Sequence, residues 1–450
     1  MDMQKRLGEE KIYKLLLEFS IPAIVGMIVN TLYNIVDRMY IGHIKGIGNL
    51  ALSGVGVAMP IVTVVSAFSM MVGIGTSYKI SIKLGENDKE NAENHLGNAV
   101  TLLLLLSFLA SVVGLVFIDP ILNIFGASKN TIGFARDYIE IIFIGTVFNM
   151  LSFGLNHSIR SDGSPKTAMF SMLIGAIANI ILDPIFIFVL DMGVRGAAIA
   201  TIIARSISTI WILYYFTKGK SILKIKKSNM KLKKEVVISI ITIGMVPFCI
   251  QIAQGFVQLI SNNALKTYGG DNAIAAMAII SSISMIFMMP VFGINQGSQP
   301  IIGFNYGAKN YERVKETVKY GVIVATIILM LGFLIIQLMP KVLISMFNDN
   351  SELINTTIKG IRIYLMMMPL VGFQVIISNL FQAIGKVKIA MVLSLLRQVI
   401  ILIPCMIIVP KFKGITGVWL SGAISDGLSA VITAIILVKT IKNMKKKIIL

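Results

Sequence analysis

The chain has 450 residues, of which 56% are hydrophobic and 14% are charged, well below the roughly 25% charged residues of soluble domains. A net charge of +19 would suit a nucleic-acid partner if the basic residues formed one cluster, but they are spread between apolar runs. Composition therefore excludes an ordinary soluble protein and argues against a nucleic-acid partner. It indicates a protein whose main solvent is lipid.

Apolar runs of about 20 residues recur along the chain, and a helix of that length crosses a hydrocarbon core of about 30 Å. The runs do not alternate polar and apolar residues as the strands of a membrane barrel do, so we predict an all-α bundle. The predicted spans are 15–40, 51–78, 96–118, 136–159, 167–190, 196–216, 236–263, 273–298, 317–339, 358–384, 388–409 and 415–438.

The basic residues predict how the chain crosses the membrane. With Met1 placed inside, 28 of the 41 Lys and Arg residues fall on the inner side and 11 on the outer side, while Arg205 and Arg397 fall within spans. The positive-inside rule then places both termini in the cytoplasm. Residues 1–14 are charged and lead into the first span without a small-residue cleavage motif, so we expect that span to stay uncleaved.

An internal repeat divides the spans into two sets of six. A shift of 222 positions aligns Gly85 with Gly307 and Gly163 with Gly385, and a shift of 221 aligns Gly193 with Gly414. An even number of spans gives both copies the same orientation, related by a pseudo-two-fold axis along the membrane normal. Such halves enclose a central site that opens to each side in turn. Channels also contain repeats, but the chain has neither a filter motif nor a ring of like charges.

The repeat predicts an N-lobe at residues 1–216, a cytoplasmic linker at 217–235 and a C-lobe at 236–450. The linker contains eight lysines between Lys218 and Lys234 and no acidic residue in that run. Membrane topology and attraction to anionic lipid explain such a run. A regulatory docking site is the alternative.

Polar residues inside the predicted spans are candidates for function, because ionisable groups are costly at membrane depth. In the first span such residues recur at helical spacing and share one face, namely Asn30, Tyr33, Asn34 and Asp37. The fifth span places Asn179 one turn before Asp183, and the sixth places Thr201 one turn before Arg205.

These groups have the chemistry of a proton or cation site. Pro184 follows Asp183 and cannot donate a hydrogen bond to the carbonyl of Ile180, which adds a free oxygen to those of the side chains. Sodium-like ions prefer oxygen ligands of this kind. We therefore predict a site for H+ or Na+, with Asp37, Asn179 and Asp183 as the possible Na+ ligands. Asp37 could instead form a solvated pair with Arg38 at the outer interface.

The second half has amides where the first has acids. We predict a substrate cleft lined by Gln251, Gln254 and Gln258 of the seventh span, Met285 and Met289 of the eighth, Gln374 and Ser378 of the tenth, and Asn30 of the first. Amides can hydrogen-bond a ligand but do not titrate, and flexible methionines suit varied ligands. Hydrogen bonding between helices is the alternative role of the amides. Asp426 is the only acid deep in this half.

The sequence 33–42, Tyr-Asn-Ile-Val-Asp-Arg-Met-Tyr-Ile-Gly, and the sequence 178–186, Ala-Asn-Ile-Ile-Leu-Asp-Pro-Ile-Phe, resemble signatures of the multidrug and toxic compound extrusion (MATE) family. The paired loops at Gly85 and Gly307 agree with this family. The resemblance covers essentially the whole chain and is nearest to DinF-like or MepA-like bacterial members. Members of the NorM type have acids in the seventh and tenth spans, where this chain has glutamines.

The resemblance implies a monomeric exporter of cationic or amphipathic drugs in the bacterial inner membrane, working by antiport against H+ or Na+. It implies two lobes that form a V-shaped cleft and rock between inward and outward states, with a cation site at Asp37, Asn179, Asp183 and Thr201. The first alternative is a lipid-linked oligosaccharide flippase of the same superfamily. The second is a membrane enzyme or receptor, but the chain has no enzyme motif and no phosphate-binding loop, so we expect neither catalysis nor a cofactor.

Overall fold

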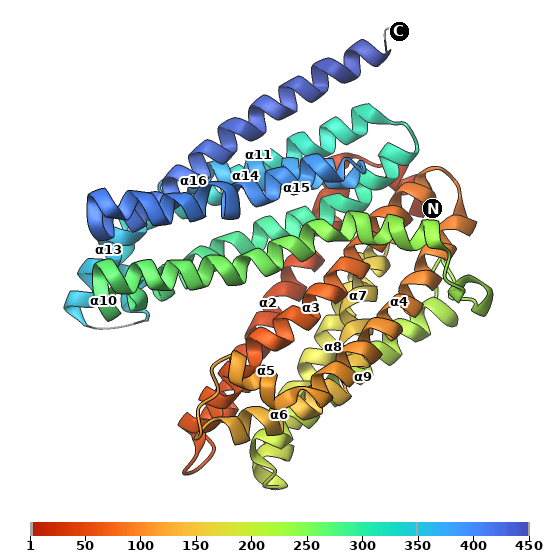
Figure 1. Cartoon of the computed structure of the whole chain (residues 1–450). Helices are drawn as coiled ribbons and strands as arrows, with labels where there is room; N and C mark the ends of the chain where they lie inside the picture. The colour runs from red at the N-terminus through yellow and green to blue at the C-terminus, as the bar shows by residue number, and fades with distance from the viewer. Residues whose placement is uncertain (1–2, 348–349, 449–450) are drawn as a thin grey trace. The chain divides into compact units, whose positions relative to one another are not determined.

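A computed structural model describes residues 3–347 and 350–448, with the side chains of residues 5–347 and 350–440. The start of the predicted N-lobe and the end of the predicted C-lobe therefore lie outside the described side chains. The latter includes the last basic residues of the predicted cytoplasmic C-terminus. The described chain is helical and contains no β-strand (Figure 1).

The helices of the first half are α1 (Met3–Glu9), α2 (Ile12–Gly42), α3 (Gly48–Gly85), α4 (Lys89–Val116), α5 (Ile118–Ile124), α6 (Ile132–Ile144), α7 (Thr146–Ser161), α8 (Pro165–Pro184), the π-helix η1 (Ile185–Val189) and α9 (Gly193–Thr217). The 3-10 helix η2 (Lys227–Met230) follows. The helices of the second half are α10 (Lys234–Gly307), α11 (Tyr311–Leu338), α12 (Pro340–Ser345), α13 (Ser351–Tyr364), α14 (Met368–Ala383), α15 (Val387–Leu395), the π-helix η3 (Leu396–Leu402) and α16 (Ile403–Ile448).

The twelve predicted spans can be followed in these helices. Within the described residues, 8 helices are long and apolar enough to cross a membrane, and two bent pairs bring the number to 10. Two of the 8 are each divided by a glycine with positive φ, α10 at Gly270 and α16 at Gly414. Each of these therefore contains two crossings, which gives the predicted twelve.

The fourth and tenth spans are bent, whereas the sequence analysis predicted continuous helices. The break between α6 and α7 turns the chain by 61° at Gly145, and the break between α13 and α14 turns it by 50°. Residue 367, which lies in the second break, is the repeat partner of Gly145. The positive-φ residues also match in pairs, Gly163 with Gly385 and Gly193 with Gly414. The repeat therefore governs backbone conformation as well as sequence.

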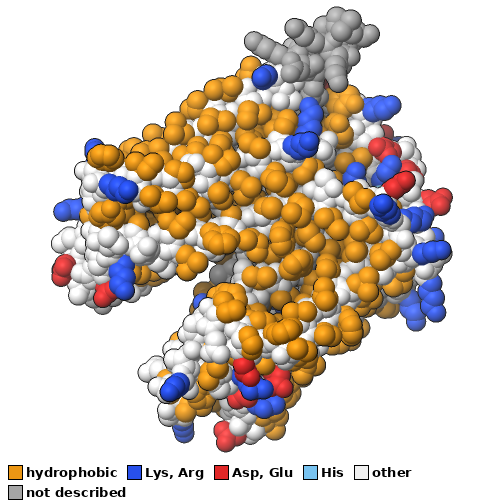
Figure 2. All heavy atoms as spheres, in the orientation of Figure 1, with side chains coloured by type: hydrophobic (Ala, Val, Ile, Leu, Met, Phe, Trp, Pro, Cys, Tyr) orange, Lys and Arg blue, Asp and Glu red, His pale blue; other side chains and the backbone are white. Residues whose placement is uncertain are grey.

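The chain divides into two compact units. The first contains Met1–Gln251 and Gly303–Tyr311, and the second contains Ile252–Ile302 and Glu312–Leu450. The visible face of each unit is covered mainly by hydrophobic side chains, and charged side chains gather toward its ends (Figure 2). This distribution is the one expected of a surface that faces lipid in the middle and water at its ends.

Within the first unit, α8 packs against α2 and α9, while α3 packs against α7 and α4. Glycines allow several of these helices to approach closely. An added Cβ on Gly75 would lie 2.1 Å from the carbonyl oxygen of Ile240, and one on Gly244 would lie 1.8 Å from that of Met71. Small residues at such crossings are typical of membrane bundles. The packing places α2, α8 and α9 side by side, and these helices carry the candidate cation site.

Candidate functional site

The polar stripe of α8 faces α2 and α9. Asn179 and Asp183 are one turn apart on α8 and are 1% and 0% exposed. The same stripe continues back through Ala176 and Gly175 to Met172. Pro184 ends α8, and η1 follows it directly. The acid is therefore held at the end of a regular helix, next to a proline.

Asp37 of α2 and Asp183 of α8 face each other inside the first unit. Asp37 is 5% exposed, and the two carboxyl groups interact directly. The alternative interpretation of Asp37, as a group solvated at the outer interface, is therefore wrong. Two ionised carboxylates in contact repel each other strongly away from water. The pair needs a shared proton or a cation.

Several oxygens of this site receive no hydrogen bond. Asn179 donates from Nδ2 to Asp183 Oδ1 at 3.0 Å and lies 3.5 Å from Thr201 Oγ1. Among the described residues, no partner reaches three buried oxygens, namely Asp37 Oδ1, Asn179 Oδ1 and Asp183 Oδ2. Buried oxygens without donors cost free energy. They are suited to binding a positive charge.

Tyr138 of α6 completes the surroundings of the acidic pair. Its side chain is 4% exposed, interacts electrostatically with Asp37 and Asp183, and forms a hydrogen bond with Thr201. Tyr138 was not among the predicted site residues. Its sequence neighbours include the charged Arg136, Asp137 and Glu140, so the sequence contains no indication that Tyr138 is buried at this site.

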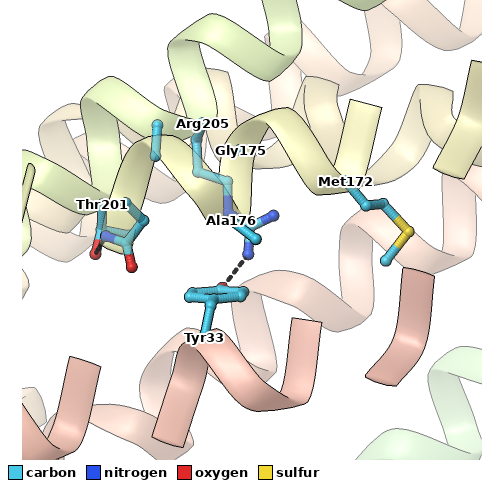
Figure 3. A pocket seen from close by; sticks show the side chains of 8 residues that line it. Tyr33, Met172, Gly175, Ala176, Thr201 and Arg205 are labelled. Carbon is cyan, nitrogen blue, oxygen red and sulfur yellow. Dashed lines mark hydrogen bonds between the residues drawn. The ribbon is translucent and has the colours of Figure 1, made fainter. Parts of the chain in front are cut away.

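A pocket lies beside the acidic pair, between α2, α8 and α9 (Figure 3). Its empty volume is about 230 Å³, including its opening to solvent, and its lining residues are Tyr33, Met172, Gly175, Ala176, Asn179, Thr201, Ala204 and Arg205. Arg205 donates from Nη2 to the hydroxyl of Tyr33, and its Cζ lies 5.5 Å from the centre of the Tyr33 ring. The pocket therefore combines an apolar wall with polar groups and the positive charge of Arg205.

Two other predicted members of the α2 stripe are placed differently. Asn34 donates from Nδ2 to the backbone oxygen of Asn30 at 2.6 Å, so its amide serves its own helix. Asn30 and Asn34 are both half-buried. The structure thus brings together Tyr33, Asp37, Asn179, Asp183 and Thr201 from the predicted cation site, and it directs Asn34 elsewhere.

The predicted cleft residues of the second half have varied environments. Gln254 and Gln258 are exposed, and Gln258 donates to Asn262 at 3.0 Å on the same helix. Gln374 is 4% exposed and donates to the carbonyl oxygen of Leu393 at 3.3 Å. That bond joins α14 to α15, which is the alternative role of the amides, hydrogen bonding between helices. The others are half-buried (Gln251 and Ser378), exposed (Met285) or buried (Met289).

The second unit also contains a buried ion pair. Arg397 of η3 donates from Nε to Asp426 Oδ1 at 2.6 Å, and Asp426 is 5% exposed. Repeat shifts of 222 and 221 align Arg397 with Gly175 and Asp426 with Arg205. The pair therefore occupies the positions that line the pocket in the first unit.

Arg160 of α7 is another residue that the sequence analysis missed, because the predicted fourth span stops at residue 159. The structure buries its side chain, which is 3% exposed, and places Nη2 3.7 Å from Met172 Sδ. Met172 itself could have been found, because it precedes Gly175 by three positions on the polar stripe.

Comparison with known proteins identifies the family. The MatE family model matches residues 22–185 and 247–408. The multidrug export protein MepA of Staphylococcus haemolyticus (strain JCSC1435) is 27% identical over 435 residues, which cover 97% of this chain and 95% of that protein.

Solved structures give the same result. The MATE multidrug transporter DinF-BH, in complex with R6G, is 38% identical, covers 98% of both chains and has a TM-score of 0.89. A MATE protein in the bent conformation is 26% identical, covers 99% of both chains and has a TM-score of 0.93. These relatives are transporters rather than enzymes, and the predicted resemblance and all-α fold are confirmed. The chain belongs to the MatE family of membrane transporters.

Proposed function

We propose that this protein exports amphipathic organic cations across the bacterial inner membrane by antiport against H+ or Na+. The observation that carries the proposal is the contact between the buried carboxyl groups of Asp37 and Asp183. The names of the relatives, a multidrug export protein and a multidrug transporter, support drugs as the transported class.

The mechanism follows from the charge of the pair. A proton or Na+ from outside binds between Asp37 and Asp183 and removes their repulsion, so α2 and α8 can approach each other. This changes the pocket that both helices line, and bound drug loses affinity and leaves outward. The two lobes then rock, the ion is released to the cytoplasm, and the pair again favours a positively charged ligand. The gradient drives export because ion and drug bind different states.

The second half supports placing the coupling site in the first. Among the described residues of this half, the only buried acid is Asp426. It already has a positive partner in Arg397, so it does not need an external cation. Gln251 and Gln254 carry no charge and do not titrate, so they remain as hydrogen-bonding ligands for drug rather than for the ion. We further propose that the protein acts as a monomer with both termini in the cytoplasm.

The test is Asp183→Asn in proteoliposomes under separately imposed pH and Na+ gradients. We expect gradient-driven efflux of a cationic dye to fall at least 100-fold, because the variant cannot exchange a positive charge with the two compartments. Asp119→Asn is the matched control, since Asp119 is exposed and paired with Arg136 at the surface. Efflux by Asp183→Asn at the rate of the unaltered protein would contradict the proposal, and the effective gradient would identify the ion.

A further inference from the structure

Arg160 has a buried guanidinium group without an acceptor for two of its nitrogens. Its side chain is 3% exposed, and no hydrogen-bond partner among the described residues reaches Nε or Nη1. In the described part of the chain, the one hydrogen bond of Nη2 is to the sulfur of Met172, a weak acceptor. An arginine remains charged in proteins, so an unpaired buried guanidinium is costly. Such a group is expected to bind an anionic oxygen.

The acid nearest to Arg160 in the sequence does not supply that oxygen. Asp162 accepts hydrogen bonds from Tyr215, from Ser221 and from the backbone nitrogen of Leu223 at 3.0 Å. The titratable group that interacts with Arg160 is His157, which cannot neutralise a positive charge. Within the described part of the chain, the charge of Arg160 therefore has no counter-ion.

Met172 connects Arg160 to the pocket of the first unit. The side chain of Met172 contacts Arg160 and also lines the pocket, with Arg205 further along its wall. Met172 and Asp183 lie on the same stripe of α8, eleven positions apart, which corresponds to about 16 Å along the helix. Arg160 belongs to α7 and contacts this stripe at Met172, and the acidic pair lies at the other end of the stripe, so groups of opposite charge lie at its two ends.

We propose that Arg160 binds the anionic group of a transported molecule, and that the preferred substrates are amphipathic zwitterions bearing a carboxylate as well as a positive charge. The positive charge would lie toward Asp37 and Asp183 and the carboxylate toward Arg160, with Arg205 between them. This inference rests on the proposed export function and defines its substrate class. An anionic lipid headgroup presents the same oxygen chemistry, so the experiment must separate the two sources.

The probe is a rhodamine dye used in two forms, the free carboxylic acid and its ethyl ester, which share the cationic ring system. Binding is measured by fluorescence anisotropy with the protein in nanodiscs of neutral phosphatidylcholine. We expect the unaltered protein to bind the acid about tenfold more tightly than the ester, because a charge-assisted hydrogen bond is added. Arg160→Gln should remove this preference and leave affinity for the ester within about twofold. Arg160→Lys, which keeps the charge, should restore part of it.

The control variant is Arg136→Gln, which removes an exposed arginine of the same unit, and size-exclusion chromatography checks folding of each variant. Equal binding of acid and ester by the unaltered protein would overturn the inference without requiring any variant to fold. An equal loss of both dyes in Arg160→Gln would show a merely structural role and would also overturn it. Nanodiscs with phosphatidylglycerol test the other source: loss of the acid preference there, together with Arg160-dependent stabilisation by that lipid, would assign the site to lipid instead.

Export of the ester by the unaltered protein in proteoliposomes tests the proposed function separately. If the ester is exported but the acid is not preferred, only the inference about Arg160 fails. If neither form is exported under any gradient, the proposed function itself fails.

Discussion

At the scale of single residues, burial of polar groups outside the membrane also has measurable consequences. Asp162 lies between α7 and α8 and is 3% exposed. Burial raises the pKa of Asp162 from 3.8 to about 6, although hydrogen bonds from Tyr215, Ser221 and the backbone of Leu223 partly oppose this shift. The folded protein therefore binds a proton here more tightly than the unfolded chain does.

This shift predicts how stability depends on pH. Because the folded pKa is raised, the contribution of Asp162 is full below about pH 4 and is lost as the pH rises to about 6. The difference amounts to at most about 3 kcal/mol. The thermal midpoint of Asp162→Asn in detergent should be lower than that of the unaltered protein at low pH but should vary less between pH 4 and 6. Asp119→Asn serves as the exposed control, and an unchanged pH profile in Asp162→Asn would contradict the assignment.

The site residues could be predicted from the sequence where one helix contains the whole pattern. The spacing of Tyr33 and Asp37, and that of Asn179 and Asp183, follows from helical periodicity alone. Tyr138 and Arg160 were missed for another reason. Their burial depends on packing between helices, because α6 lies against α3 and α9, whereas α7 lies against α3, α4 and α8. Periodicity within one segment contains no information on that packing.

At the scale of elements, the close crossing of α3 with the first half of α10 depends on glycine. Gly75 lies inside α3, and its added Cβ would lie 2.1 Å from a backbone oxygen of Ile240, which a helix cannot move as easily as a side chain. Gly56 lies in the same helix, and its added Cβ would meet nothing within 4 Å. The two glycines therefore differ in packing while they share helical conformation.

Alanine substitution should separate these two effects. Gly56→Ala should stabilise the protein by up to about 1 kcal/mol, because alanine is the better helix former. Gly75→Ala should destabilise it by about 1–3 kcal/mol, because the added methyl group forces the helices apart. Thermal unfolding in detergent measures both. If Gly75→Ala were as stable as Gly56→Ala, the close crossing would not exist in solution.

The positions of the helices were largely predictable from hydropathy, since apolar runs of about 20 residues have few alternatives. The bends were not. The breaks between α6 and α7 and between α13 and α14 interrupt segments whose hydropathy continues through them, so composition could not reveal them. Only backbone conformation and packing distinguish a bent span from a straight one.

At the scale of the whole molecule, the linker at residues 217–235 is fixed to the first unit along much of its length. Asn98 of α4 donates to the carbonyl oxygens of Asn229 and Lys231 and accepts from the backbone nitrogen of Lys233 at 2.8 Å. Glu93 accepts from Lys226 Nζ at 2.7 Å. Most of the lysine side chains of the linker are nevertheless exposed. Their charge remains available to anionic lipid, as the sequence analysis predicts, while the backbone is held in place.

Removing the side chain of Asn98 should release the linker. We expect Asn98→Ala to be cleaved by trypsin in the linker about tenfold faster than the unaltered protein, because local opening exposes the lysine backbone. Asn91→Ala is a suitable control, since Asn91 lies at the start of the same helix and its amide bonds to Asp88. Equal cleavage rates for Asn98→Ala and the control would mean that these hydrogen bonds do not restrain the linker.

The ion pair of Arg397 and Asp426 gives the two copies of the repeat different roles. Gene duplication begins with identical halves, but here the halves differ. In the second half Arg397 and Asp426 neutralise each other, whereas in the first half Arg205 and the acidic pair can bind ligands of opposite charge. The second half, whose buried charges are paired, should change little when an ion binds, whereas the first half should respond to it. The two halves of the repeat therefore respond differently to ions because they differ at two pairs of aligned positions, Gly175 with Arg397 and Arg205 with Asp426.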